Sequence, residues 1–127
     1  MNPFPPVRRS PIAGAWYPSN PAILQTEIDG YIEQAQLPDL PGEVIGVIAP
    51  HAGYFYSGPT AGYAYHCVKG KSFDLCAVFS PLHDYMPDDF LTTAHQAYST
   101  PLGLVPVDQA LITEVTVRME RKISQSL

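Results

Sequence analysis

Two short apolar runs that flank one helical segment constrain this chain more than any other feature of its sequence. Residues 44–49 and 73–79 are almost wholly apolar, and the first run is rich in β-branched side chains, as in strands buried on both faces of a parallel sheet. Residues 59–69 have a helical pattern, with Pro59 at its start and Gly70 after its end. This order predicts a βαβ unit over residues 44–79. We therefore expect an α/β fold, with a mainly parallel or mixed sheet flanked by helices.

The rest of the chain predicts a single domain over residues 1–127 with an irregular arm at its start. Residues 1–18 contain five prolines and are expected to form this arm. Asn20 and Pro21 predict the cap and the first residue of a helix, which ends before the proline-rich run at residues 37–42. A third strand is expected over residues 90–98, a turn at residues 101–103, and a last helix after Asp108.

Charge and hydropathy exclude several classes of protein. The formal net charge is −5, which excludes a binder of nucleic acid, since such a protein needs positive charge against the phosphates. Apolar residues make up 46% of the chain, too many for a disordered segment. No apolar stretch reaches the ~18 residues that span a bilayer, and the start of the chain has no apolar signal region. We therefore expect a cytoplasmic protein that contacts no membrane.

Histidines follow both of the apolar runs. The carboxyl ends of parallel strands meet at one edge of a sheet, where ligands of α/β proteins bind. His51 comes two residues after the first run and His83 four residues after the second, so the topology places both in one crevice. Two neutral imidazoles suit iron, zinc, copper or nickel. The competing interpretation is that each histidine only hydrogen-bonds to loop backbone.

The loop after the first run has an unusual composition. Glycines in residues 50–58 allow close approach of the backbone to a ligand, and Tyr54 and Tyr56 would give the crevice an apolar wall with polar tips. Phe55 is expected in the core. A phosphate-binding loop is excluded, because Pro59 stands where such a loop needs its lysine. We therefore expect no nucleotide cofactor.

Four other reactive side chains are assigned structural roles. Cys67 and Cys76 form no zinc or redox motif, and we expect two buried free thiols. For His66 and His95, a hydrogen-bonded or surface role is favoured over metal binding.

Four segments resemble, in order and spacing, the motifs of a known family. They are AGAWYP at residues 13–18, PHAGYFYSG at residues 50–58, SPLH at residues 80–83 and TPLGLVPVD at residues 100–108. Together they are similar to motifs of the Memo family, whose prokaryotic members include protein B of the AmmeMemoRadiSam system. The resemblance implies an α/β fold related to class III extradiol dioxygenases, with a mononuclear iron or copper site. It implies that His51 and His83 are metal ligands and that Trp16 and Tyr56 line the pocket.

This chain differs from the family pattern in sequence and in length. Ser80 and Leu82 differ from the family pattern before the second histidine. Family members are longer, and their second half supplies the third metal ligand, so this chain resembles an N-terminal half. We expect an incomplete domain, in which Asp84 beside His83 is a candidate pocket residue and a weaker candidate ligand. We also expect either a homodimer or association with a complementary second half.

The function expected from these residues is conditional. Completed by a second half, the crevice would bind a metal and have a redox or dioxygenase-like role. The alternatives are a non-catalytic module that binds a small molecule or a peptide, and a truncated product without activity of its own. The substrate, the metal and the third ligand stay open at this point.

Overall fold

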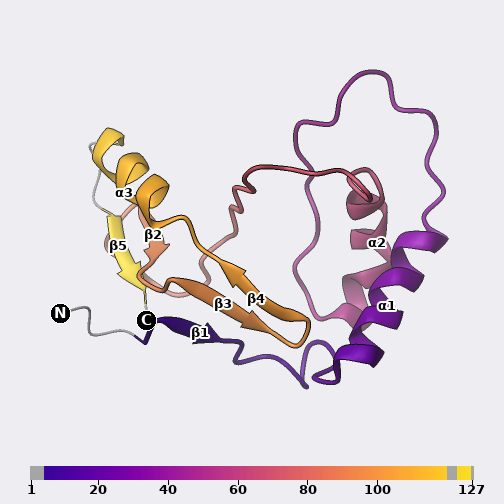
Figure 1. Cartoon of the computed structure of the whole chain (residues 1–127), viewed down its shortest axis with the longest axis horizontal. Coiled ribbons are helices and arrows are strands. Elements are labelled where there is room, and N and C mark those ends of the chain that lie inside the picture. Colours follow the sequence, from indigo (N-terminus) through magenta and orange to yellow (C-terminus); the bar gives the residue numbers. More distant parts are fainter. Residues whose placement is uncertain (1–4, 120–122, 127) are drawn as a thin grey trace. The chain divides into compact units, whose positions relative to one another are not determined.

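The structure is a computed structural model that describes residues 5–119 and 123–126, and it divides the chain into two compact units. Residues Pro11–Cys76 form one unit, which we call the helical unit. Residues Met1–Ser10 together with Ala77–Leu127 form the other, which we call the sheet unit. Figure 1 shows the elements of each.

The helical unit consists of helix α1 (Pro21–Gln34), helix α2 (Tyr54–His66) and the loops around them. As predicted, Asn20 caps α1: its side-chain oxygen accepts hydrogen bonds from the backbone N–H groups of Ala22, at 2.9 Å, and Ile23, at 3.1 Å. Pro21 follows in the first turn, where its missing N–H has no cost. A long loop then joins α1 to α2 (Figure 1).

Two glycines allow α1 and α2 to pack closely. A Cβ atom on Gly58 would lie 2.5 Å from the ring of Tyr31, and one on Gly62 would overlap the Tyr31 carbonyl oxygen. Glycine is therefore required at position 62, where the neighbouring atom is backbone, whereas a side chain at position 58 would displace the Tyr31 ring. Near the end of α2, His66 Nδ1 donates a hydrogen bond of 2.7 Å to the carbonyl oxygen of Ile32 on α1. Leu24 of α1 is buried in this unit.

The sheet unit contains two small sheets. In the first, strand β3 (Ala97–Thr100) lies between the parallel strand β1 (Val7–Arg9) and the antiparallel strand β4 (Gly103–Pro106). In the second, strand β2 (Phe90–Thr93) pairs in parallel with strand β5 (Ile123–Ser126). Helix α3 (Gln109–Arg118) follows β4, and the Asp108 side chain caps it by accepting from Leu111 N–H at 2.9 Å, as predicted.

The expected mixed α/β class is confirmed, and so is the turn at residues 101–103, which joins β3 to β4. Thr100 fixes this turn: its hydroxyl accepts from Leu102 N–H at 3.1 Å and donates to the Gly103 carbonyl oxygen at 3.0 Å. No helix among the described residues is both long and apolar enough to cross a membrane.

The two strands of the predicted βαβ unit do not form, and this prediction is corrected. Within the described residues, 44–49 and 73–79 take part in no ladder, and only the helix between them forms. A parallel strand depends on neighbours for its hydrogen bonds, and no described strand pairs with either run. Their side chains are accordingly exposed, with Ile45 and Ile48 each at 98% and Phe79 at 91%. Cys76 in the second run is exposed as well, not buried.

Helix α2 begins earlier than predicted. It starts at Tyr54, so Pro59 lies inside the helix and not at its first position. The Gly53 carbonyl oxygen accepts from Tyr56 N–H at 2.9 Å and from Ser57 N–H at 3.1 Å, which starts the first turn ahead of the proline. The Ser57 hydroxyl donates to the Ala52 carbonyl oxygen at 2.9 Å and supports the same turn.

Two strand predictions also need correction. The arm expected over residues 1–18 is not wholly irregular, because Val7–Arg9 forms β1. The strand expected over residues 90–98 is divided into β2 and the start of β3, which belong to different sheets. The break falls at Ala94 and His95, both buried. The side chain of Gln109, the first residue of α3, donates to the His95 carbonyl oxygen at 2.6 Å and so connects this break to α3.

Candidate functional site

Two of the four motif segments meet in the helical unit, at the start of α2. The Tyr54 N–H donates a hydrogen bond of 2.8 Å to the Trp16 carbonyl oxygen. The rings of Tyr17 and Tyr54 lie with their centroids 5.4 Å apart and their planes at 40°. A Cβ atom on Gly53 would be 3.4 Å from the Trp16 carbonyl oxygen, so the two segments lie in close contact here. We call this contact the Trp16 junction.

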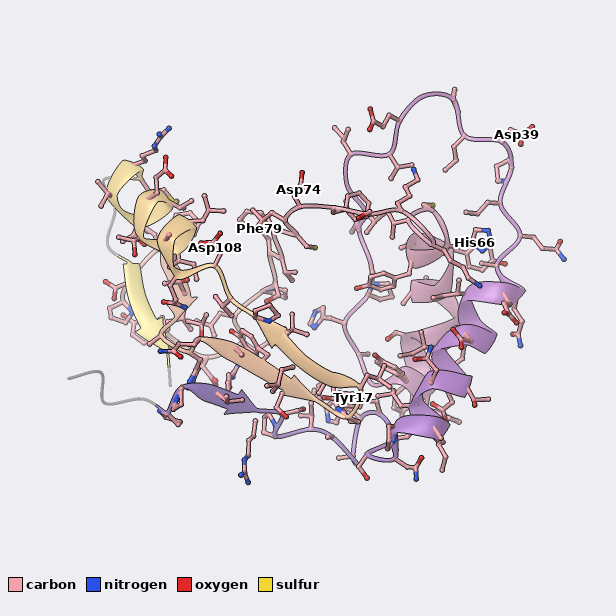
Figure 2. All side chains as sticks on the ribbon, in the orientation of Figure 1. Tyr17, Asp39, His66, Asp74, Phe79 and Asp108 are labelled. Atoms are coloured by element: carbon pink, nitrogen blue, oxygen red, sulfur yellow. The ribbon has the colours of Figure 1, made fainter. Side chains whose placement is uncertain are left out.

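A tight turn holds the first motif in place. The Gly14 N–H donates to the Tyr17 carbonyl oxygen at 2.7 Å, and the Trp16 N–H donates to the Ile12 carbonyl oxygen at 2.9 Å. Gly14 has a φ of +87°, a conformation that side chains with a Cβ rarely adopt. The glycine of AGAWYP therefore lets the chain turn so that Trp16 and Tyr17 reach α2. Figure 2 labels Tyr17 at this place.

Tyr54 is the titratable side chain of the junction. Burial raises the pKa of its phenol above 10.0, and the nearby phenol of Tyr17 raises it further, as do Tyr65 and Glu27. Both effects disfavour a negative charge at this position. Without a metal ion, Tyr54 is therefore a neutral hydrogen-bonding group at neutral pH.

The next two aromatic residues face solvent. Phe55 and Tyr56 are 86% and 80% exposed, and their rings meet edge to face with centroids 5.2 Å apart. The prediction that Phe55 lies in the core is therefore wrong: the early start of α2 puts it on the first turn, away from α1. Tyr56 lies where a ligand can reach it, which is compatible with the predicted pocket wall. Trp16, at 49% exposure, is also accessible.

The two histidines that the sequence singles out lie in different units. His51 is exposed in the segment before α2 of the helical unit. His83 and Asp84 are exposed in the segment that precedes β2 in the sheet unit. A crevice shared by His51 and His83 thus stays a prediction, which the contacts inside either unit do not test.

The two histidines suit a transition metal in kind. Two imidazoles suit iron or copper. Among the described residues, however, no three His, Cys, Asp or Glu side chains are grouped so that they could hold an ion. His66 and His95 serve other purposes, because their Nδ1 atoms donate to the carbonyl oxygens of Ile32 and Pro5, each at 2.7 Å. Their predicted hydrogen-bonded roles are confirmed.

The helical unit also contains an open pocket that the sequence did not predict. Its volume is about 400 Å³, and it lies between residues 40–48 and the C-terminal part of α2. Val44 and Val47 line one side, and Ala64 and Cys67 the other. The apolar run was a signal for this position, but it was interpreted as a strand within a sheet. The Cys67 thiol is half-buried here and donates to the Tyr63 carbonyl oxygen at 3.3 Å.

Comparison with known proteins assigns the chain to a family. Residues 8–126 match the model of the Memo-like protein family. A MEMO1 family protein of Nitrosopumilus maritimus is 36% identical over 86% of this chain and 41% of its own length. MEMO1 family protein MTH_45 of Methanothermobacter thermautotrophicus is 38% identical over 88% of this chain and 43% of its own length.

The similarity extends to animal proteins. Protein MEMO1 of Xenopus laevis is 33% identical over 85% of this chain and 36% of its own length. The chain thus spans less than half the length of these curated relatives. With the family match over residues 8–126 and the Trp16 junction formed between two of its motif segments, this chain belongs to the Memo-like protein family.

Proposed function

We propose that this chain is the histidine-bearing part of a Memo-like metal-binding protein, in which His51 and His83 bind iron or copper. Trp16, Tyr54 and Tyr56 form the aromatic wall of the same site, and Asp84 lies at its edge. The Trp16 junction supports this proposal most directly. It joins two family-like motifs through the 2.8 Å bond from Tyr54 to Trp16, and His51 stands three residues before Tyr54 in one of those motifs.

The residues of the proposed site have distinct parts. Neutral imidazole nitrogens of His51 and His83 are the donors, and a bound iron or copper ion would supply redox chemistry and an affinity for oxygen. Tyr54 has a raised pKa, so it offers a phenolic hydrogen-bond donor to a ligand but no base. The half-exposed indole of Trp16 offers an apolar surface.

We propose a redox or dioxygenase-like role for the completed site only. A facial site of two histidines needs a third protein ligand, and the described residues do not group one with them. The relatives have more than half their length beyond the matched region, which is where the remaining ligand and any acid–base group would come from.

Metal retention by purified variants tests the two histidines. We expect the chain, dialysed to equilibrium against Fe(II) without oxygen or against Cu(II), to retain metal that His51→Ala and His83→Ala each lose. The affinity for the metal should fall at least about tenfold in each variant. Removing a residue that only hydrogen-bonds to a metal ligand already costs about tenfold or more. Metal content is measured by elemental analysis.

His66→Asn is the matched control for this experiment. It replaces a histidine outside the motifs, and the asparagine N–H can still reach the Ile32 carbonyl oxygen that His66 contacts at 2.7 Å. Equal metal retention in the wild type, both alanine variants and the control would contradict the metal site. The second reading would then stand, in which Trp16 and Tyr56 form a non-catalytic pocket for a small molecule or a peptide.

A further inference from the structure

Two apolar segments of this chain have the composition of buried strands but pair with no described strand. Val44–Ile48 carries no charge, and Phe73–Phe79 carries only Asp74; both have the composition of strands covered on both faces. In the structure they are unpaired, and no hydrogen bond joins their backbone to another described residue. Figure 2 labels Asp74 and Phe79 along the second segment, which is drawn as coil.

The side chains of both segments are uncovered to a degree that is unusual for aliphatic and aromatic residues. Ile45 and Ile48 are each 98% exposed, and Val78 and Phe79 are 82% and 91% exposed. Proteins that function alone seldom expose such runs, and unpaired strands of this kind tend to acquire partners. The open pocket beside Val44 and Val47 shows that the C-terminal part of α2 is also incompletely covered.

We propose that Val44–Ile48 and Phe73–Phe79 are docking strands, which pair with the polypeptide that forms the remainder of a Memo-like fold. Two observations favour this occupant. Relatives that match 85–88% of this chain do so with only 36–43% of their own length, so in each of them more than half of the polypeptide lies outside the matched region. The second observation concerns charge. A second copy of this chain fits less well, because it has the same net charge of −5 and would be repelled.

This docking surface is separate from the metal site. None of its residues is a proposed ligand or a member of the Trp16 junction. Docking can therefore be observed in a His51→Ala, His83→Ala double variant. Its failure would leave metal binding by the two histidines, which is measured on this chain alone, to be decided separately.

Cys76 is a built-in probe of docking, because it lies inside the second segment and its thiol is exposed. The experiment uses the 127-residue chain with Cys67→Ala, so that Cys76 alone reacts. The partner is the remainder of the Methanothermobacter thermautotrophicus relative outside its matched segment, co-expressed and purified through its own tag. We expect a one-to-one complex in which iodoacetamide alkylates Cys76 at least about tenfold more slowly than in the free chain.

Introducing positive charge on the exposed apolar face sharpens this test. Ile45→Lys with Ile48→Lys should weaken the complex about a hundredfold or more, because docking would then bury two ammonium groups. The same pair should leave the free chain folded, since both side chains are almost fully exposed there. Ile23→Lys, on the half-exposed surface of α1, is the matched control and should bind as the wild type does.

A covalent fusion of the same remainder to this chain covers the case in which the separate polypeptide does not fold. Backbone amides of residues 44–48 and 73–79 should exchange with solvent at least about a hundredfold more slowly in the fusion than in the chain alone. Three results would overturn the proposal. They are unprotected amides in the fusion, a complex in which Cys76 reacts at the free rate, and a homodimer that already protects Cys76 without any partner.

Discussion

At the scale of single residues, Tyr54 shows how one side chain links a local contact to the stability of a unit. Its backbone holds Trp16, its ring meets Tyr17, and its hydroxyl lies where burial and the neighbouring Tyr17, Tyr65 and Glu27 raise its pKa. The sequence indicated that Tyr54 belongs to the site. It did not indicate this environment, which depends on a turn more than thirty residues away along the chain.

Removal of the Tyr54 hydroxyl should change the response to alkaline pH. Because folding raises this pKa above 10.0, the folded state favours the neutral phenol, and the resulting stability is complete below pH 10 and is lost as the pH rises through the folded pKa. Tyr54→Phe should therefore lose less stability than the wild type between about pH 8 and about pH 11. Urea unfolding, followed by circular dichroism at both values, measures the difference. Tyr63 is exposed on α2, so Tyr63→Phe should behave as the wild type. An identical loss of stability in all three proteins would refute the raised pKa of Tyr54.

At the scale of elements, the contact between α1 and α2 depends on two glycines that leave room for Tyr31. Gly62→Ala would put a methyl group against the Tyr31 carbonyl oxygen, which is backbone and cannot turn aside. We expect this substitution to lower the free energy of unfolding by about 1–3 kcal/mol, despite the better helix propensity of alanine.

Gly30→Ala provides the opposite case within the same pair of helices. Gly30 lies in α1, and nothing stands within 4 Å of where its Cβ would be. Alanine there should raise the free energy of unfolding by about 0.5–1 kcal/mol. Thermal unfolding of both variants tests the helix packing, and shifts in melting temperature of the same sign would contradict it.

The elements that sequence reasoning placed well are those fixed by local chemistry. The caps at Asn20 and Asp108 and the turn after Thr100 each depend on hydrogen bonds within a few residues. The start of α2 was misplaced because Pro59 was interpreted as a first residue, although Gly53 accepts the first bonds of that helix. The expected strands at residues 44–49 and 73–79 have the right composition. Composition cannot supply a partner strand, and the described part of the chain has none for them.

The same distinction holds for the candidate site. Motif similarity selected Trp16, the composition of the loop at residues 50–58 selected Tyr54, and the structure brings the two together inside one unit. His51 and His83 were selected by topology, through a βαβ unit whose strands are not paired here. Their convergence therefore awaits the metal experiment. The pocket beside Val44 went unpredicted because it forms where a strand was expected to be covered.

At the scale of the whole molecule, charge and exposed apolar surface act against each other. The net charge of −5 repels copies of the chain at pH 7, whereas Ile45, Ile48 and Phe79 favour association. Self-association measured by light scattering should therefore be strongest near the sequence pI of 5.1. Ile45→Lys should suppress it more than Gln36→Lys, which changes the charge equally at an exposed polar position. Equal suppression by both would show that charge alone controls association.

The parallel pairing of β1 with β3 has a consequence for the order in which the molecule can be made. Val7 lies opposite Ala97, so the sheet unit joins two segments about ninety residues apart in the sequence. The helical unit is one uninterrupted stretch, Pro11–Cys76. All residues of α1 and α2 are therefore synthesised before β3. The chain grows at only about 5–20 residues per second, so β3 follows after a delay. During that interval β1 cannot form its parallel pairing, because β3 has not yet been synthesised.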